Sequence, residues 1–219
     1  MDCCSSGYDE VFTARQARWF RRRYETHGLG QPAATLADLA AAGGLDGRTV
    51  LEIGGGVGDL HVDLLRRGAA TATNVELSSS WEEQAGELLD AHGLRGRVTR
   101  VVGDLVTDPG LAGAADIVVL NRVVCCYPDF VGLLAAAGAR ARQTLVFSYP
   151  PRHPLVRAGL ALLNAWQRLR GRGYRAFAHP PSAMHEVLQE AGLRRVFGGR
   201  QGVWRVSALA RVDALERAA

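Results

Sequence analysis

The sequence predicts an α/β fold, namely a doubly wound, mostly parallel sheet of seven strands with an antiparallel C-terminal edge hairpin and an N-terminal helical lid. Two observations predict it. From residue 48 onward, short apolar runs typical of buried parallel strands alternate with segments of helical periodicity. The first of these strands also runs into a glycine-rich turn, Gly54 to Gly58, which leads directly into a helix.

The individual elements follow from periodicity and from glycine and proline at their ends. Helices are expected over residues 9–27, 32–42, 59–67, 81–92, 130–142, 155–169 and 183–191. Strands are expected over residues 48–53, 70–76, 97–102, 116–121, 144–148, 193–197 and 203–212. Gly198-Gly199 are expected in the link between the last two strands, which favours an antiparallel hairpin at the edge of the sheet.

The length of 219 residues suits one globular domain with a sizeable core. We expect an N-terminal helical lid over residues 1–45 and a Rossmann-like domain over residues 46–219. Residues 150–180 break the alternation with Pro150-Pro151, an apolar to amphipathic helix and Pro180-Pro181. This insertion follows the fifth strand, where such segments often cover the site at the carboxyl ends of the strands.

Composition limits the partners and the location of the protein. The net charge is +4, and all 26 basic residues are arginine. Aromatic residues near the densest basic run, residues 15–23, are too few to predict nucleic-acid binding. No apolar stretch reaches the roughly 18 residues of a membrane span, and residues 1–5 do not resemble a signal peptide, so we expect a cytoplasmic protein. We expect a monomer or a homodimer.

The spacing of the glycine turn excludes two common nucleotide sites. Counting from Gly54 puts Asp59 where a dinucleotide fingerprint requires its third glycine, and counting from Gly56 puts His61 there. A phosphate-binding loop is excluded because the chain has no lysine. The pattern that remains is Glu52-x-Gly54-x-Gly56-x-Gly58.

This pattern resembles motif I of the class I S-adenosylmethionine-dependent methyltransferases. The resemblance covers roughly residues 46–212 and implies S-adenosyl-L-methionine as cofactor. Glu76 ends the second strand, where a carboxylate can accept the ribose hydroxyls. The resemblance further implies that Asp104, after the third strand, meets the adenine amino group. The complete set of residues expected to bind the cofactor is Tyr8, Glu52, Gly54, Gly56, Gly58, Glu76, Leu77, Gly103, Asp104, Leu105 and Asn121.

Within that superfamily the chain is similar to small-molecule O-methyltransferases such as magnesium-protoporphyrin methyltransferase. Arg18-Trp19 with Tyr24, Tyr127-Pro128 after the fourth strand, and residues 145–151 carry this similarity. Where that family tends to have His-Tyr-Pro, this chain has Cys126-Tyr127-Pro128. A side chain beside the acceptor therefore differs. The resemblance implies transfer of a methyl group to a small-molecule acceptor, and we expect the attack at oxygen.

Candidates for catalysis must lie beyond the strand ends, where an acceptor would meet the methyl group. His153 is the preferred general base, because it follows the fifth strand and opens the insertion. Tyr127 and Cys126 follow the fourth strand and are further candidates, as are His27, Cys125, Tyr149 and His179, and Tyr8 is a candidate lid residue. Arg122 could hold a carboxylate of the cofactor or of the acceptor.

Two alternatives stay open. The first is methylation of a thiol or metalloid acceptor through Cys125-Cys126 and Cys3-Cys4. Adjacent cysteines lack the spacing of a zinc site, so no metal centre is expected. The other alternative is a non-catalytic module that binds the cofactor. The helix at Leu155–Leu169 is interpreted as a lid, with contact to a membrane or a hydrophobic substrate as the competing interpretation.

Overall fold

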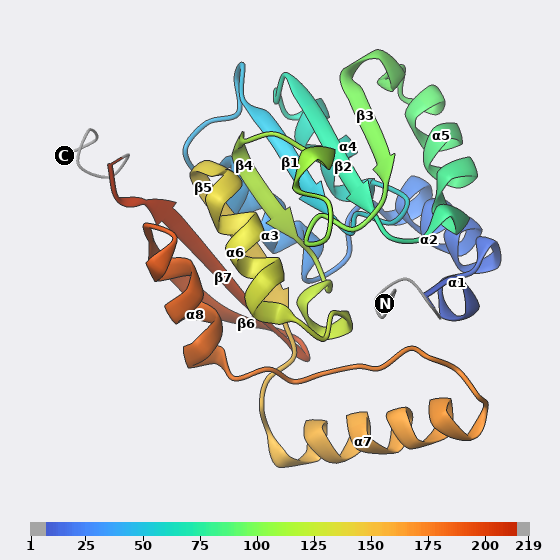
Figure 1. The fold of residues 1–219 in the computed structure, drawn as a ribbon. Coiled ribbons are helices and arrows are strands. Elements are labelled where there is room, and N and C mark those ends of the chain that lie inside the picture. The colour runs from blue at the N-terminus through green and yellow to red at the C-terminus, as the bar shows by residue number, and fades with distance from the viewer. Residues whose placement is uncertain (1–7, 214–219) are drawn as a thin grey trace.

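The computed structural model describes residues 8–213, which form one sheet of seven strands in the order β3-β2-β1-β4-β5-β7-β6 (Figure 1). The five strands from β3 to β5 are parallel, while β7 pairs antiparallel with both β5 and β6. The predicted fold class is confirmed. The strands are β1 (Thr49–Ile53), β2 (Thr71–Glu76), β3 (Val98–Val102), β4 (Ala115–Leu120), β5 (Ala141–Tyr149), β6 (Leu193–Gln201) and β7 (Trp204–Arg211).

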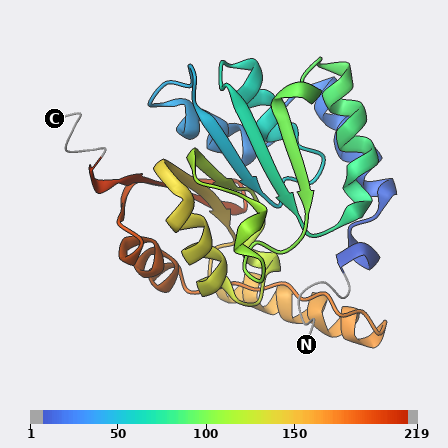
Figure 2. The same ribbon diagram turned by 45° about the horizontal axis from the view of Figure 1, so that its top comes forward.

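The helices cover both faces of this sheet, as the two views show (Figures 1 and 2). Neighbouring residues of a strand alternate between the faces: Val50 packs with α3, α4 and α5, whereas Leu51 packs with α6 and α8. The helices are α1 (Tyr8–Val11), α2 (Ala14–His27), α3 (Ala33–Ala41), α4 (Asp59–Arg66), α5 (Glu82–Ala91), α6 (Phe130–Arg140), α7 (Pro154–Leu169) and α8 (Pro181–Glu190).

The N-terminal segment differs from the single helix that was expected over residues 9–27. The helix expected over 9–27 is divided into α1 and α2, because Thr13 begins α2 with a capping box: its hydroxyl accepts from the Gln16 amide, and the Gln16 side chain accepts from the Thr13 amide. The next helix, α3, is buried against the sheet beside α4 through residues that include Leu36 and Ala37. Helices α1 and α2 lie near the strand ends, and α3 belongs to the helical layer, with its first residue, Ala33, reaching the same edge.

The C-terminal hairpin also has a different turn from the one expected. Gly198 and Gly199 lie inside β6 and pair with β7, and the chain reverses at Gly202, whose φ is +59°. Glycine inside a strand often accompanies a bulge, and the register of β6 shifts between Arg195 and Phe197, just before these glycines. Strand β5 is longer than expected and begins at Ala141, because its first residues already pair with β4.

The topology brings the carboxyl ends of β1 to β4 to one edge of the sheet, and the strand order reverses between β1 and β4. Ligands of doubly wound folds bind at this kind of switch point. The segment 150–180 forms α7 and an extended return that we call the strap (residues 171–180). Figures 1 and 2 show α7 outside the two helical layers, beyond the carboxyl ends of the strands. No helix within residues 8–213 is long and apolar enough to cross a lipid bilayer.

Candidate active site

A cavity of about 450 Å³ opens at the carboxyl edge of the strands. Its volume lies in the range of pockets that bind small molecules. The walls come from the glycine turn, from the ends of β2, β3 and β4, and from α1 and α2. The lining includes Tyr8, Phe12, Arg23, Glu52, Gly54, Gly55, Gly56, Asp59, Glu76, Leu77, Trp81, Gly103, Asp104, Leu105, Asn121, Arg122, Val123, Cys126 and Tyr127.

The glycine turn (residues 54–58) needs glycine for its backbone and for close packing. Gly54 and Gly58 have φ values of +67° and +85°, which side chains of L-residues rarely allow. A Cβ atom on Gly54 would lie 2.5 Å from Val123 Cγ2, and one on Gly58 would lie 2.3 Å from the His61 ring. The turn therefore presents bare backbone to the cavity and lets a ligand approach it closely.

A buried polar cluster, made by side chains of β1, β2 and α4, lies against the glycine turn. The Glu52 carboxylate lies 2.6 Å from His61 Nδ1 and accepts from the His61 amide, and both side chains are buried. The Gly55 amide donates to Asn74 Oδ1 at 3.0 Å. Because these bonds tie the turn to β1, β2 and α4, they fix its shape before any ligand binds.

Glu76 presents a fixed carboxylate at the end of β2. Its oxygens accept from the amides of Gly56 at 2.8 Å, Leu77 at 2.9 Å and Ser78 at 3.2 Å. Burial raises the pKa of Glu76. The three hydrogen bonds from backbone amides oppose that rise, because they favour the charged form. Leu77 lines the cavity next to it. The arrangement can accept hydrogen bonds from a ligand with neighbouring hydroxyl groups.

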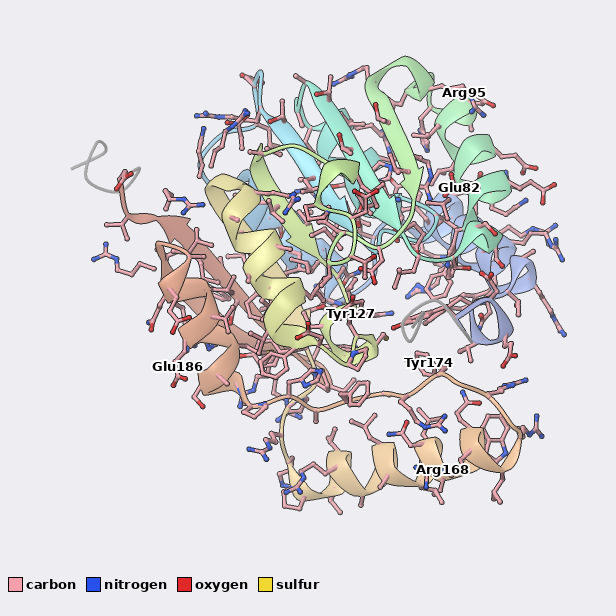
Figure 3. The ribbon with its side chains drawn as sticks, viewed as in Figure 1. Glu82, Arg95, Tyr127, Arg168, Tyr174 and Glu186 are labelled. Atoms are coloured by element: carbon pink, nitrogen blue, oxygen red, sulfur yellow. The ribbon has the colours of Figure 1, made fainter. Side chains whose placement is uncertain are left out.

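Asp104 is held from two sides after β3. Its carboxylate accepts from the Val106 amide at 2.9 Å and from the Tyr127 hydroxyl at 2.7 and 3.0 Å. Tyr127 is buried, and Figure 3 shows it between the sheet and α7. Asp104 and Tyr127 both line the cavity, flanked by Gly103 and Leu105. The sequence suggested separate roles for them and gave no signal of this contact.

A second acid, Asp59, begins α4 immediately after the glycine turn and also lines the cavity. Burial and the nearby Glu52 charge raise the pKa of Asp59 to about 7, and Arg122 acts against that rise. The sequence interpretation missed this residue. Its signal was an acid at the first position of a helix that follows a ligand-binding turn.

Arg122 follows β4 in a strained backbone conformation, with φ at +61°. Its amide donates to Ser148, whose hydroxyl donates to Asn121 Oδ1. Its guanidinium donates to the Gln31 carbonyl at 2.5 Å and lies over the Trp204 ring. Burial lowers the pKa of Arg122, and the charge of Arg23 on α2 adds to the effect. Arg23 and Arg122 thus give the cavity a cationic end suited to a carboxylate.

Three segments distant in sequence meet at Cys126, between β4 and α6. The Tyr8 hydroxyl donates to the Cys126 carbonyl at 2.5 Å, and the Cys126 thiol lies 3.1 Å from the Tyr174 hydroxyl of the strap. Tyr8, Phe12 and Tyr174 pack ring against ring. The strap is fixed here by the Phe177 amide, which donates to the Cys125 carbonyl. Tyr174, which Figure 3 labels, was missed because its position depends on this tertiary packing.

The two adjacent thiols lie close together, with 3.6 Å between Cys125 Sγ and Cys126 Sγ. Their mutual hydrogen bond lowers the pKa of Cys126 and raises the pKa of Cys125. Cys126 lines the cavity, whereas Cys125 lies behind it. Cys3 and Cys4 lie outside the described residues.

His153 lies apart from the other residues that the sequence singled out. It is the exposed N-cap of α7, where its Nδ1 accepts from the Leu155 amide, and it is not part of the cavity lining. His179 on the strap contacts the Tyr127 carbonyl through Nε2 and stacks between Phe130 and Phe177. Among the described residues, no histidine lines the cavity.

Comparison with known proteins places this geometry among the methyltransferases. A family model described as "Methyltransferase domain" matches residues 20–196. No curated protein matches the sequence.

Solved structures share the fold. The magnesium protoporphyrin IX methyltransferase from Synechocystis, crystallised with S-adenosylhomocysteine, is 22% identical with a TM-score of 0.69, over 92% of this chain and 97% of that one. An O-methyltransferase family protein from Burkholderia thailandensis is 20% identical with a TM-score of 0.72, over 94% of this chain and 63% of that one. A putative sarcosine dimethylglycine methyltransferase from Galdieria sulphuraria is 12% identical with a TM-score of 0.63, over 91% of this chain and 86% of that one.

Proposed function

The chain belongs to the methyltransferase domain family, and from that premise we propose that it transfers a methyl group from S-adenosylmethionine to an oxygen atom of a small-molecule acceptor. The observation that carries the proposal is the convergence of the glycine turn, Glu76 and Asp104 on one cavity. The solved methyltransferase structures that share this fold, including one crystallised with S-adenosylhomocysteine, support the choice of donor.

The residues at the cavity fit this donor. S-adenosylmethionine carries no phosphate, which agrees with a turn that offers open backbone instead of a lysine. We assign its ribose hydroxyls to the Glu76 carboxylate, which three backbone amides hold in place. We assign its adenine amino group to Asp104, which Tyr127 holds in place. Arg23 and Arg122 are the groups we assign to its carboxylate.

We assign the acceptor to the end of the cavity at Cys126, which Tyr8 also lines, while Tyr174 contacts the Cys126 thiol from outside the cavity lining. When bound, the cofactor supplies a methyl group on a sulfonium, which an oxygen lone pair can attack in line. The aromatic wall orients the acceptor and keeps water out, and orientation alone can supply much of the rate of such a transfer. Tyr127 positions Asp104, and His153 takes no part in the chemistry.

The experiment that tests this function supplies methyl-¹³C-labelled S-adenosylmethionine with a panel of small phenols and carboxylic acids. Nuclear magnetic resonance then locates the labelled carbon, and chromatography measures S-adenosylhomocysteine. We expect the label on oxygen in one acceptor class, with equal amounts of S-adenosylhomocysteine, and loss of both products in Glu76→Ala. Binding of the donor without transfer to any acceptor would instead support a non-catalytic binding module.

A second candidate function is methylation of a thiol or metalloid acceptor, which the 3.6 Å separation of the Cys125 and Cys126 thiols favours. Its test compares Cys126→Ser with Cys125→Ser. Under this candidate, arsenite binds the wild-type protein and is methylated, and Cys126→Ser abolishes both. Under the oxygen proposal, arsenite is not methylated and Cys126→Ser retains the transfer to oxygen. Within the described residues, no group of three histidine, cysteine or acidic side chains could hold a metal ion.

A further inference from the structure

Helix α7 leaves an apolar stripe uncovered by the described residues. Leu155, Leu162 and Leu169 recur every seven residues and are 77%, 74% and 86% exposed, and Leu163 and Trp166 extend the same stripe. At 100° per residue, these five side chains fall within an arc of about 120°. Five large apolar side chains on one exposed helix face form a patch of the kind that marks an interaction site.

The neighbouring face of α7 is already occupied. Its least exposed residues are Val156, Leu160, Asn164 and Gln167, which lie on the side facing the strap. The Asn164 amide group exchanges two hydrogen bonds of 2.8 Å with the backbone of Ala176. The helix is therefore fixed to the strap by this side, which adjoins the stripe and leaves it uncovered.

The charge around the stripe has one sign. Residues 130–185 contain no aspartate or glutamate, and six arginines lie between residues 150 and 180. Two of them lie over the exposed tryptophan, with the guanidinium carbons of Arg170 and Arg172 at 4.2 and 5.7 Å from the Trp166 ring centroid. Figure 3 shows Arg168 on the same helix. The segment that carries the stripe therefore combines leucine, tryptophan and arginine without any acid of its own.

We propose that α7 binds the surface of an anionic phospholipid bilayer and lies in its plane, with the stripe between the headgroups and the acyl chains. Helices with a leucine and tryptophan face flanked by arginine bind membranes in this way, and each arginine near an anionic surface adds to the attraction. Arginine and tryptophan side chains also suit the headgroup region, where their polar ends stay hydrated.

The charge pattern favours lipid over a second copy of the chain. A symmetric dimer through this face would bring Arg170 and Arg172, which lie over Trp166, close to the same arginines of the other copy, and like charges at close range oppose association. The stripe lies outside the cavity, so membrane binding does not depend on the proposed methyl acceptor.

The test uses the full chain and flotation with two vesicle types, one of phosphatidylcholine and one of phosphatidylcholine with a quarter phosphatidylglycerol. We expect binding to the anionic vesicles that weakens with salt. The double variant Leu162→Gln/Leu169→Gln should bind at least tenfold more weakly, because it removes apolar side chains without adding charge. Val203→Gln, at an equally exposed valine in the turn between β6 and β7, should bind like the wild type.

A second arm tests the charge. Arg170→Gln, at the arginine that lies over Trp166, should lower the affinity for anionic vesicles about fivefold, since one arginine contributes about 1 kcal/mol near such a surface. Calorimetric binding of S-adenosylhomocysteine and circular dichroism should be unchanged in every variant. The proposal is overturned if the wild-type chain does not float with anionic vesicles, or if the leucine variant floats equally well. Dimerisation that the leucine variant abolishes, without vesicle binding, would assign the stripe to a second copy.

Discussion

The Tyr127 hydroxyl donates to both oxygens of Asp104, at 2.7 and 3.0 Å. Tyr127 comes from the segment after β4 and Asp104 from the segment after β3, so the bond joins two strand ends across the cavity. The carboxylate that we assign to the adenine is thus held by a residue of the acceptor side. A change at Tyr127, beside the proposed acceptor, should therefore also affect how Asp104 binds the adenine.

Tyr127→Phe removes this bond and leaves the ring in place. A hydrogen bond to a charged group contributes about 1.5 kcal/mol or more, so we expect S-adenosylhomocysteine to bind about tenfold more weakly. Isothermal titration calorimetry measures the change. Tyr149→Phe is the matched control, because Tyr149 is a buried tyrosine on β5 outside the cavity lining, and its affinity should stay within twofold of wild type. Equal affinities for the three proteins would remove Tyr127 from the donor site.

Gly58→Ala should disrupt the glycine turn. The new Cβ meets the His61 ring at 2.3 Å in a backbone conformation of φ +85°, so we expect a loss of about 2–4 kcal/mol in the free energy of unfolding. Urea denaturation measures it. Gly159→Ala is the control, because its Cβ would meet open space on α7, and alanine is the better helix former. Similar stability of the two variants would contradict the close packing of the turn.

The raised pKa of Asp59 predicts a stability that depends on pH. Its pKa is about 7 in the folded chain and near 3.8 when unfolded. Well below pH 3.8 the carboxyl is protonated in both states, so the penalty for burying its charged form is absent. Between pH 3.8 and about 7, Asp59 is ionised in the unfolded chain but still protonated in the folded chain. The free energy of unfolding therefore falls as the pH rises, and this fall levels off above about pH 7.

Asp59→Asn removes that penalty. We expect the free energy of unfolding of the variant to be a few kcal/mol higher than that of the wild type at about pH 8. The difference should vanish near pH 4. Urea denaturation at both pH values measures the two differences. A gain of the same size at both would mean that Asp59 keeps its ordinary pKa in the folded protein.

Arg122→Asn tests the cationic end of the cavity. Asparagine tolerates the left-handed backbone that Arg122 adopts, so the variant removes the guanidinium and spares the turn. We expect donor affinity to fall about tenfold to a hundredfold, as when a charged hydrogen-bond partner is lost. Arg152→Asn, at an exposed arginine outside the cavity lining, should bind normally. If both variants bound equally well, the carboxylate assignment would be wrong.

His153→Ala tests whether the N-cap histidine of α7 takes part in the chemistry. Because His153 is exposed and outside the cavity lining, we expect kcat within twofold of the wild-type value and an unchanged dependence of kcat on pH. A steady-state assay from about pH 6 to pH 9 measures both. A fall of a hundredfold or more, with loss of one limb of the pH profile, would restore His153 as the general base.

The strand ends were predictable because topology determines where they lie. Once Glu52, Glu76 and Asp104 were assigned to the ends of parallel strands, the fold itself brought them to one edge. The positions of Tyr174 and Arg23 were not predictable in the same way. They come from the strap and from α2, whose placement depends on ring packing and on contacts between segments far apart in sequence.

Element boundaries failed where local signals competed. The alanine-rich run before β5 suits a helix, and pairing with β4 decided that Ala141 belongs to the strand. Gly198-Gly199 suggested a turn, yet both residues pair with β7 and the reversal occurs at Gly202. The sequence also gave no sign that His153 would cap α7 instead of facing the cavity, because an N-cap and a catalytic loop residue occupy the same kind of position.

The measurement that tests the central claim most directly is a crystal structure of the chain with S-adenosylhomocysteine. We predict that its ribose hydroxyls lie within hydrogen-bond distance of the Glu76 carboxylate and its adenine beside Asp104, with the sulfur directed toward Cys126. A ligand bound outside this cavity, or one whose ribose contacts a different side chain, would contradict the assignment of the donor site.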